Sequence, residues 1–217
     1  AEEMLGWAQQ QGILAVSARA YAAEGRLAYG AIAEYLAAEA LQASIAHMDA
    51  VWLVELARLR PELLTAYPHL PHPEPLLDPW QRRRLFEALA RVFVVKGRPL
   101  LLVLDDLQWL SEETLEWLHY LLRFDLQARL LVLGTMRLEE VDVSHPLAAL
   151  LLALRSAGQL TDLPLNPLDA NETAELACQI RQAPLDAATA QQLFRVTEGN
   201  PLFVVETMRA DKSPHMA

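Results

Sequence analysis

Two adjacent carboxylates, Asp105 and Asp106, are the residues of this sequence best suited to chemistry. They follow five consecutive apolar residues, Leu100 to Leu104, a run typical of a strand buried on both faces of a sheet. The carboxyl end of a parallel strand opens onto a crevice where ligands bind, so acids there can hold a metal ion or orient a water molecule. The alternative is a pair that simply begins a solvated loop, since a short motif alone is weak support for function.

A second strand repeats this placement. Residues 129–133 are mostly apolar and lead into Gly134-Thr135-Met136-Arg137, so Thr135 and Arg137 are expected at the carboxyl end of another buried strand. A guanidinium is a fixed bidentate donor suited to the charge of a phosphate. A surface arginine that leads into Leu-Glu-Glu is the alternative for Arg137.

The composition indicates a folded, acidic protein. Of the 217 residues, 53% are hydrophobic and 21% are charged, which argues against a disordered chain. The net charge of −10 and a pI near 5.0 argue against a broad nucleic-acid surface, so DNA contact is expected only through domains outside this chain. The single cysteine, Cys178, excludes an internal disulfide framework and a Cys-rich zinc site.

No targeting or membrane segment is recognisable in the sequence. It contains no apolar run of the roughly 18 to 20 residues needed to span a bilayer. It also lacks the basic segment followed by an apolar segment that marks a signal peptide. We therefore expect a soluble, cytoplasmic protein without a membrane partner.

The elements that must position the acids alternate between helix and strand. Four segments ahead of the prolines are expected to be regular: residues 1–11, 31–41 and 48–59 as helices, and residues 13–17 as a buried strand. Six of the 13 prolines lie in residues 61–79. This segment cannot hold a long helix or a central strand, and we expect an ordered surface crossing, with a flexible linker as the alternative.

The rest of the chain is predicted to complete the α/β core and add a helical part. Helices are expected at residues 80–95, from a cap at Ser111, and at residues 146–157, with a last strand at 160–165. Capping signals then predict three helices, at residues 169–181, 186–198 and 201–209. We therefore divide the chain into a partial α/β core, residues 1–166, and a helical lid, residues 167–217.

Four blocks in this order resemble the AAA-type ATPase domain of STAND signalling proteins, found in bacterial multidomain transcriptional activators and cyclase-linked regulators. The blocks are residues 13–41, 99–111, 134–147 and 197–203. The resemblance implies a P-loop NTPase sheet followed by a helical lid, with ATP between them. It also implies a nucleotide-driven switch that controls oligomerisation and an output domain.

The resemblance implies roles for individual residues. Asp105 matches the Mg²⁺-associated acid of the Walker B motif, and Asp106 matches its catalytic acid. Arg137 matches the residue at the end of the sensor strand. Pro201 stands in a Gly-Asn-Pro motif whose proline packs near adenine, although a plain helix cap is the alternative for that motif. ATP or ADP with Mg²⁺ is the implied cofactor of the parent protein.

The Walker A motif of this family is absent. A phosphate cradle needs Gly-x-x-x-x-Gly-Lys-Ser/Thr, and the only lysines, Lys96 and Lys212, follow no such glycines. Residues 1–11 resemble the helix after the motif, so the chain is expected to begin inside that helix. Alone it is not expected to hydrolyse ATP, and nucleotide binding by it is left open.

The absent motif predicts a defect in the sheet. The resemblance suggests that its strand lies between the strands at 100–104 and 129–133. Unpaired backbone groups on a buried edge are costly, so we expect either direct pairing of these two strands or a gap covered by self-association or another chain. The rival hypothesis is a non-catalytic protein-interaction module in which the acids and the Gly-Asn-Pro turn are structural.

Overall fold

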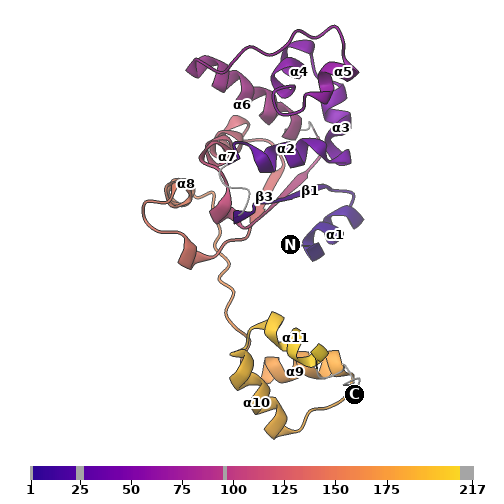
Figure 1. Cartoon of the computed structure of the whole chain (residues 1–217), viewed down its shortest axis with the longest axis vertical. Coiled ribbons are helices and arrows are strands. Elements are labelled where there is room, and N and C mark those ends of the chain that lie inside the picture. Colours follow the sequence, from indigo (N-terminus) through magenta and orange to yellow (C-terminus); the bar gives the residue numbers. More distant parts are fainter. Residues whose placement is uncertain (1, 23–26, 95–96, 211–217) are drawn as a thin grey trace, which may run out of the picture. The chain divides into compact units, whose positions relative to one another are not determined.

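The computed structural model describes residues 2–22, 27–94 and 97–210 (Figure 1). The chain forms two compact units, residues 1–160 and 161–217. The first combines a sheet with helices, and the second is built from helices. Within the described ranges, no helix is both long and apolar enough to cross a membrane.

The sheet of the first unit has three parallel strands in the order β1-β2-β3. They are β1 (Leu14–Arg19), β2 (Leu100–Asp105) and β3 (Leu130–Gly134). Leu100 to Leu104 of β2 are at most 2% exposed, because this strand has a neighbour on each side and packed side chains on both faces. The predicted α/β parallel sheet is thereby confirmed. The strands β2 and β3 pair directly, so no strand lies between them.

The two faces of the sheet carry different layers. Leu100, Leu102 and Leu104 belong to the main core, which includes side chains of α6 (Pro79–Phe93), α7 (Glu112–Phe124) and α8 (Pro146–Ser156). Leu101 and Val103 face the other way, toward α1 (Glu2–Gln10). The helix α1 contacts β1 and β2, so the sheet is covered on both faces, as a parallel sheet requires.

Four short helices follow β1 and correct one of the expectations. They are α2 (Gly30–Ala37), α3 (Glu39–Ala46), α4 (Ala50–Leu56) and α5 (Glu62–Ala66). One helix over residues 31–41 is wrong, because Ala38 is extended, with ψ at 133°, and separates α2 from α3. The proline-rich crossing contains α5, which has only five residues, so no continuous helix runs through the segment, as expected.

The strand expected at residues 160–165 is also wrong. This segment is irregular, and Leu163 and Leu165 are 75% and 95% exposed. A strand needs a neighbouring strand to satisfy its backbone, and this segment pairs with none of the three strands of the sheet.

A buried carboxylate ties α4 to α6. Glu55 is 4% exposed, and its oxygens lie 2.7 Å from Arg58 Nε and 3.2 Å from Arg84 Nε. Arg58 also donates to the carbonyl of Glu74, so the same cluster holds the proline-rich crossing against the core. This contact favours an ordered crossing over a flexible linker.

Glu55→Ala is expected to destabilise the first unit by about 3 kcal/mol, because it leaves the largely buried Arg58 guanidinium without its carboxylate partner. All five tryptophans lie between residues 7 and 117, so tryptophan fluorescence during urea unfolding reports on this unit. The matched control is Glu87→Ala, which breaks the exposed pair with Arg91 and should cost no more than about 0.5 kcal/mol. Equal losses for the two variants would contradict the structural role of Glu55.

The described part of the second unit, residues 161–210, has three helices, α9 (Ala170–Arg181), α10 (Ala187–Thr197) and α11 (Pro201–Ala210). Its small core contains Ala177, Leu193, Val204 and Met208. Asp169 and Glu172 form the predicted capping box at the start of α9. Gly199, at φ +75°, lies between α10 and α11, where its carbonyl accepts from Leu168 N at 2.8 Å.

Gly199→Ala should unfold the junction of α10 and α11. A Cβ at this position would lie 2.0 Å from the Leu168 carbonyl oxygen, and the left-handed backbone adds about 1 kcal/mol for a non-glycine residue. Hydrogen–deuterium exchange across residues 170–210 should therefore accelerate. The control is Gly158→Ala, with φ +66° but no atom within 4 Å of the added Cβ, which should leave this exchange unchanged. Slow exchange in the Gly199 variant would show that the close contact is dispensable.

Candidate functional site

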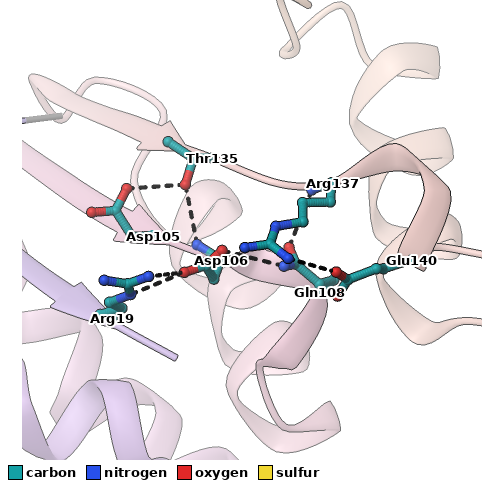
Figure 2. Close-up of polar contacts among 7 residues, drawn as sticks. All are labelled: Arg19, Asp105, Asp106, Gln108, Thr135, Arg137 and Glu140. Atoms are coloured by element: carbon teal, nitrogen blue, oxygen red, sulfur yellow. Dashed lines mark hydrogen bonds and ion pairs between the residues drawn. The ribbon is translucent and has the colours of Figure 1, made fainter. Parts of the chain in front are cut away.

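The carboxyl ends of the three strands meet in one polar cluster (Figure 2). Arg19 ends β1, Asp105 ends β2, and Thr135 follows β3. The parallel register places Arg19 opposite Asp105 and Leu104 opposite Gly134. The sheet therefore brings together residues that lie more than 100 positions apart in the sequence.

Asp105 is half-buried and has one carboxylate oxygen available. Its Oδ1 accepts a hydrogen bond from Thr135 Oγ1 at 3.0 Å. Its Oδ2 has no partner among the described residues. A carboxylate fixed through one oxygen and open at the other is suited to a hard cation or a cation-bound water.

Asp106 is the more buried of the two acids, at 8% exposed. Its backbone is left-handed, with φ 61° and ψ 52°, which aspartate tolerates better than most residues. Its Oδ2 lies 2.9 Å from both Nε and Nη2 of Arg19, and its Oδ1 accepts from Gln108 Nε2 at 3.3 Å. The charge of Asp106 is therefore neutralised inside the protein by a residue of the neighbouring strand.

Thr135 joins the two acids. Its hydroxyl donates to Asp105 and accepts from the Asp106 N–H at 3.1 Å, while its backbone N–H donates to Leu104. The preceding residue is glycine because a Cβ there would lie 2.4 Å from Leu107 Cδ1. Leu107 can thus pack over the end of β3, and its N–H donates to the Thr135 carbonyl at 2.9 Å.

Arg137 lies beside the cluster without contacting either acid. Its backbone N–H donates to Gln108 Oε1 at 3.3 Å, and its guanidinium pairs with Glu140 at 3.0 Å. The guanidinium also lies over the Trp109 ring, 5.4 Å from its centroid. Figure 2 shows the Arg137 side chain reaching toward Glu140.

Pro201, the remaining predicted site residue, is the first residue of α11 in the second unit. Asn200 Oδ1 accepts from Leu202 N at 3.0 Å beside it, which is the geometry of a helix cap. The contact of Pro201 with adenine stays a prediction. Lys96 and Lys212, the only lysines, lie outside the described residues.

The donors present fit a hydrated Mg²⁺ ion better than a protein-enclosed metal centre. A carboxylate and a hydroxyl oxygen are hard ligands, and Mg²⁺ usually binds one or two carboxylates with waters and phosphates. In the described ranges, no group of three or more His, Cys, Asp and Glu side chains converges. The remaining ligands would come from water and a phosphate. These 217 residues contain no lysine and glycine loop to cradle that phosphate.

The sequence model of the AAA ATPase domain matches residues 3–133, which is more than half of the chain. The chain belongs to this family. The matched region contains both acids, all of α1 except its first residue and all of β3 except its last residue, so it includes the strands that build the cluster. This membership indicates an ATPase-like module of a nucleotide-binding family. Searches among curated proteins and among solved structures found no match.

Sequence reasoning did not assign a role to Arg19 or Gln108, two polar partners of Asp106. The argument that located the acids could also have located Arg19, because this residue lies at the carboxyl end of a short buried strand and β1 is parallel to β2. Gln108 had no such signal. Its position depends on the left-handed turn at Asp106, which sequence does not specify.

A double-mutant cycle measures the Arg19–Asp106 pair. Arg19→Ala should cost about 1 kcal/mol, a value reduced by the exposure of the arginine side chain. Arg19→Ala combined with Asp106→Asn should cost about 1 kcal/mol less than the sum of the single variants, because the uncompensated charge is gone. Urea unfolding followed by tryptophan fluorescence provides the free energies.

Arg137→Ala is the control for this cycle. Its ion pair with Glu140 is exposed, so the variant should stay within about 0.5 kcal/mol of the parent chain. Strict additivity of the Arg19 and Asp106 substitutions would contradict an energetically coupled pair.

Proposed function

We propose that this chain is the nucleotide-binding core and lid of a STAND-type regulatory ATPase that switches a transcriptional or signalling output. The observation that carries the proposal is the acid pair at the carboxyl end of the most buried strand, held by Thr135 and Arg19 from the strands on either side. A pair that only began a solvated loop would not need partners from two neighbouring strands.

The two acids have different tasks in this proposal. Asp105, with its free Oδ2, orients Mg²⁺ through water, and the cation neutralises phosphate charge when it is bound. Asp106 accepts a proton from the attacking water. Because Arg19 occupies Asp106 Oδ2 at 2.9 Å, the observed arrangement is a resting one in which the base is engaged. Release of Arg19 is the step that makes this oxygen available.

Arg137 is proposed to act as the sensor that contacts the γ-phosphate. Its present pair with Glu140 is half-exposed, and such pairs contribute no more than about 1 kcal/mol. Replacing Glu140 by a doubly charged phosphate as the partner of Arg137 therefore costs little free energy. Pro201 is proposed to pack near adenine from the lid. DNA contact and the output belong to domains outside this chain, and we propose a cytoplasmic setting.

The open edge of β3 is the proposed location of the strand that carries the phosphate cradle. The connections β1 to β2 and β2 to β3 pack on one face of the sheet, whereas α1 packs on the other. Crossovers between parallel strands are right-handed in nearly all proteins. The two crossovers on the first face step from β1 toward β3, so a right-handed crossover through α1 on the other face must step toward β1 from the β3 side. A strand that precedes α1 would therefore lie beyond β3.

Exposed groups on β3 support this location. Hydrogen bonds from Leu100 N to Arg129 O and from Thr135 N to Leu104 O leave the backbone groups of Leu130, Val132 and Gly134 directed outward. Leu131 is 55% exposed. The cover is thus needed at the outer edge of β3, whether the preceding chain, a second copy or another chain supplies it.

Calorimetric titration with Mg-ATP and Mg-ADP tests the function. We expect little or no binding to residues 1–217 and clear binding to a version extended upstream through a Walker A motif. In the extended version, Asp105→Ala should weaken Mg²⁺-dependent binding at least tenfold, and Pro201→Ala should weaken it less. Asp125→Ala, at an exposed acid beyond the end of α7, should have no effect.

Two results would contradict the proposal. An extended chain that binds no nucleotide would favour the protein-interaction module. Equal binding by the Asp105→Ala and Asp125→Ala variants would remove the acid pair from the nucleotide site.

A further inference from the structure

The outer edge of β1 is a second unpaired edge of the sheet, on the side away from β3. Leu14 N donates to Pro99 O and Ala20 N donates to Asp105 O, so the even-numbered residues of β1 face β2. Neighbouring residues of a strand direct their backbone groups to opposite sides. Ala15 and Ser17 therefore direct N–H and C=O groups outward, where no described residue pairs with them.

An open hollow of about 470 Å³ lies along these two residues. It is lined by β1 together with α1 on one side and the α2–α3 corner on the other; its residues are Gln9, Ala15, Val16, Ser17, Ala38, Glu39 and Ala40. Figure 1 shows β1 between α1 and the α2–α3 segment. The side chains of Ala38 and Ala40 are small, so another backbone can come close to the strand.

The carboxyl end of this edge is already closed. Arg19 N, the next outward donor, bonds to Glu34 Oε2 at 3.2 Å. A side-chain carboxylate thus takes the place of a carbonyl from a further strand. The open ladder is limited to Ala15 and Ser17, a length that three or four residues of extended chain would cover.

The charges beside the hollow indicate which kind of partner can bind there. Two exposed acids lie here: Glu39 lines the hollow, and Glu34 accepts from Arg19 N at the carboxyl end of the strand, in a chain of net charge −10. A second copy paired edge to edge would bring the same acids from both chains together, which is repulsive. A positively charged segment would be attracted.

We propose that the outer edge of β1 binds an extended, basic polypeptide segment by strand addition. Main-chain hydrogen bonds to Ala15 and Ser17 supply affinity, and alternate side chains of the segment face Glu39. The open segment itself, Ala15 and Ser17, contacts neither acid and lies away from the edge of β3, so we expect the peptide to bind in the absence of nucleotide.

The test uses a fluorescein-labelled octapeptide of alternating lysine and valine and measures fluorescence anisotropy with the full chain. We expect saturable binding, together with slower hydrogen exchange at the Ala15 and Ser17 amides. The same peptide N-methylated at alternate residues keeps its charge but cannot complete the ladder, and it should bind at least tenfold more weakly. Equal binding by the methylated peptide would overturn the proposal, because it would show that charge alone is recognised.

Variants of the chain separate the backbone from the side chains. Ser17→Pro removes the outward N–H and should abolish binding, whereas Ser17→Ala keeps the backbone and should bind as the parent does. Ala40→Trp fills the hollow and should also abolish binding. This variant still tests the proposal if Ser17→Pro does not fold. Glu39→Lys should weaken binding at least tenfold.

Undiminished binding by the Ala40→Trp variant would overturn the proposal. So would a peptide-free dimer, detected by analytical ultracentrifugation, that dissociates on the Ser17→Pro substitution, since that result would assign the edge to a second copy.

Discussion

The double pairing of β2 is the constraint on which the rest of the first unit depends. This strand is bonded on both sides and buried on both faces, so its five apolar residues can take only one register without exposing a face. That register determines where the chain leaves the sheet, and it leaves at Asp105 and Asp106. Two carboxylates at the end of such a strand have little freedom to move, and a site that must position water and a cation gains from that rigidity.

The polar cluster combines rigid and exchangeable contacts. Thr135 holds Asp105 and the Asp106 backbone through one hydroxyl, and Gly134 allows Leu107 to close over the strand end. By contrast, the guanidinium groups of Arg19 and Arg137 are half-exposed and paired with carboxylates. A bound phosphate would compete for both arginines. The two acids are therefore held in place while the cations around them are free to exchange partners.

Local signals in the sequence were enough to find the most buried strand, the acids after it and several helix starts. The run Leu100 to Leu104 is typical of a buried strand, and the capping side chains of Ser111 and Asp169 are local features that the structure retains. The break at Ala38 has no such signal, since alanine favours helix. It arises from packing, as do the loss of the strand at 160–165 and the pairing of Arg19 with Asp106.

Of the two outcomes expected for the sheet, direct pairing of β2 with β3 is the one observed. Placing an absent strand between β2 and β3 required knowledge of which strands are neighbours, and that is set by crossover handedness and by the face each helix covers. Because α1 packs on the face opposite to α6 and α7, the proposed place of that strand is the outer edge of β3. The two edges of the sheet differ in their side chains. The β3 edge exposes apolar residues, whereas small residues and acids lie along the β1 edge.

The most direct test of this account is a crystal structure of the chain extended upstream through the Walker A motif, with Mg-ADP bound. The account predicts an added parallel strand bonded to Leu130, Val132 and Gly134, β2 still paired with β3, and Mg²⁺ within one water of Asp105 Oδ2. A strand inserted between β2 and β3, or a nucleotide bound away from the acid pair, would contradict it.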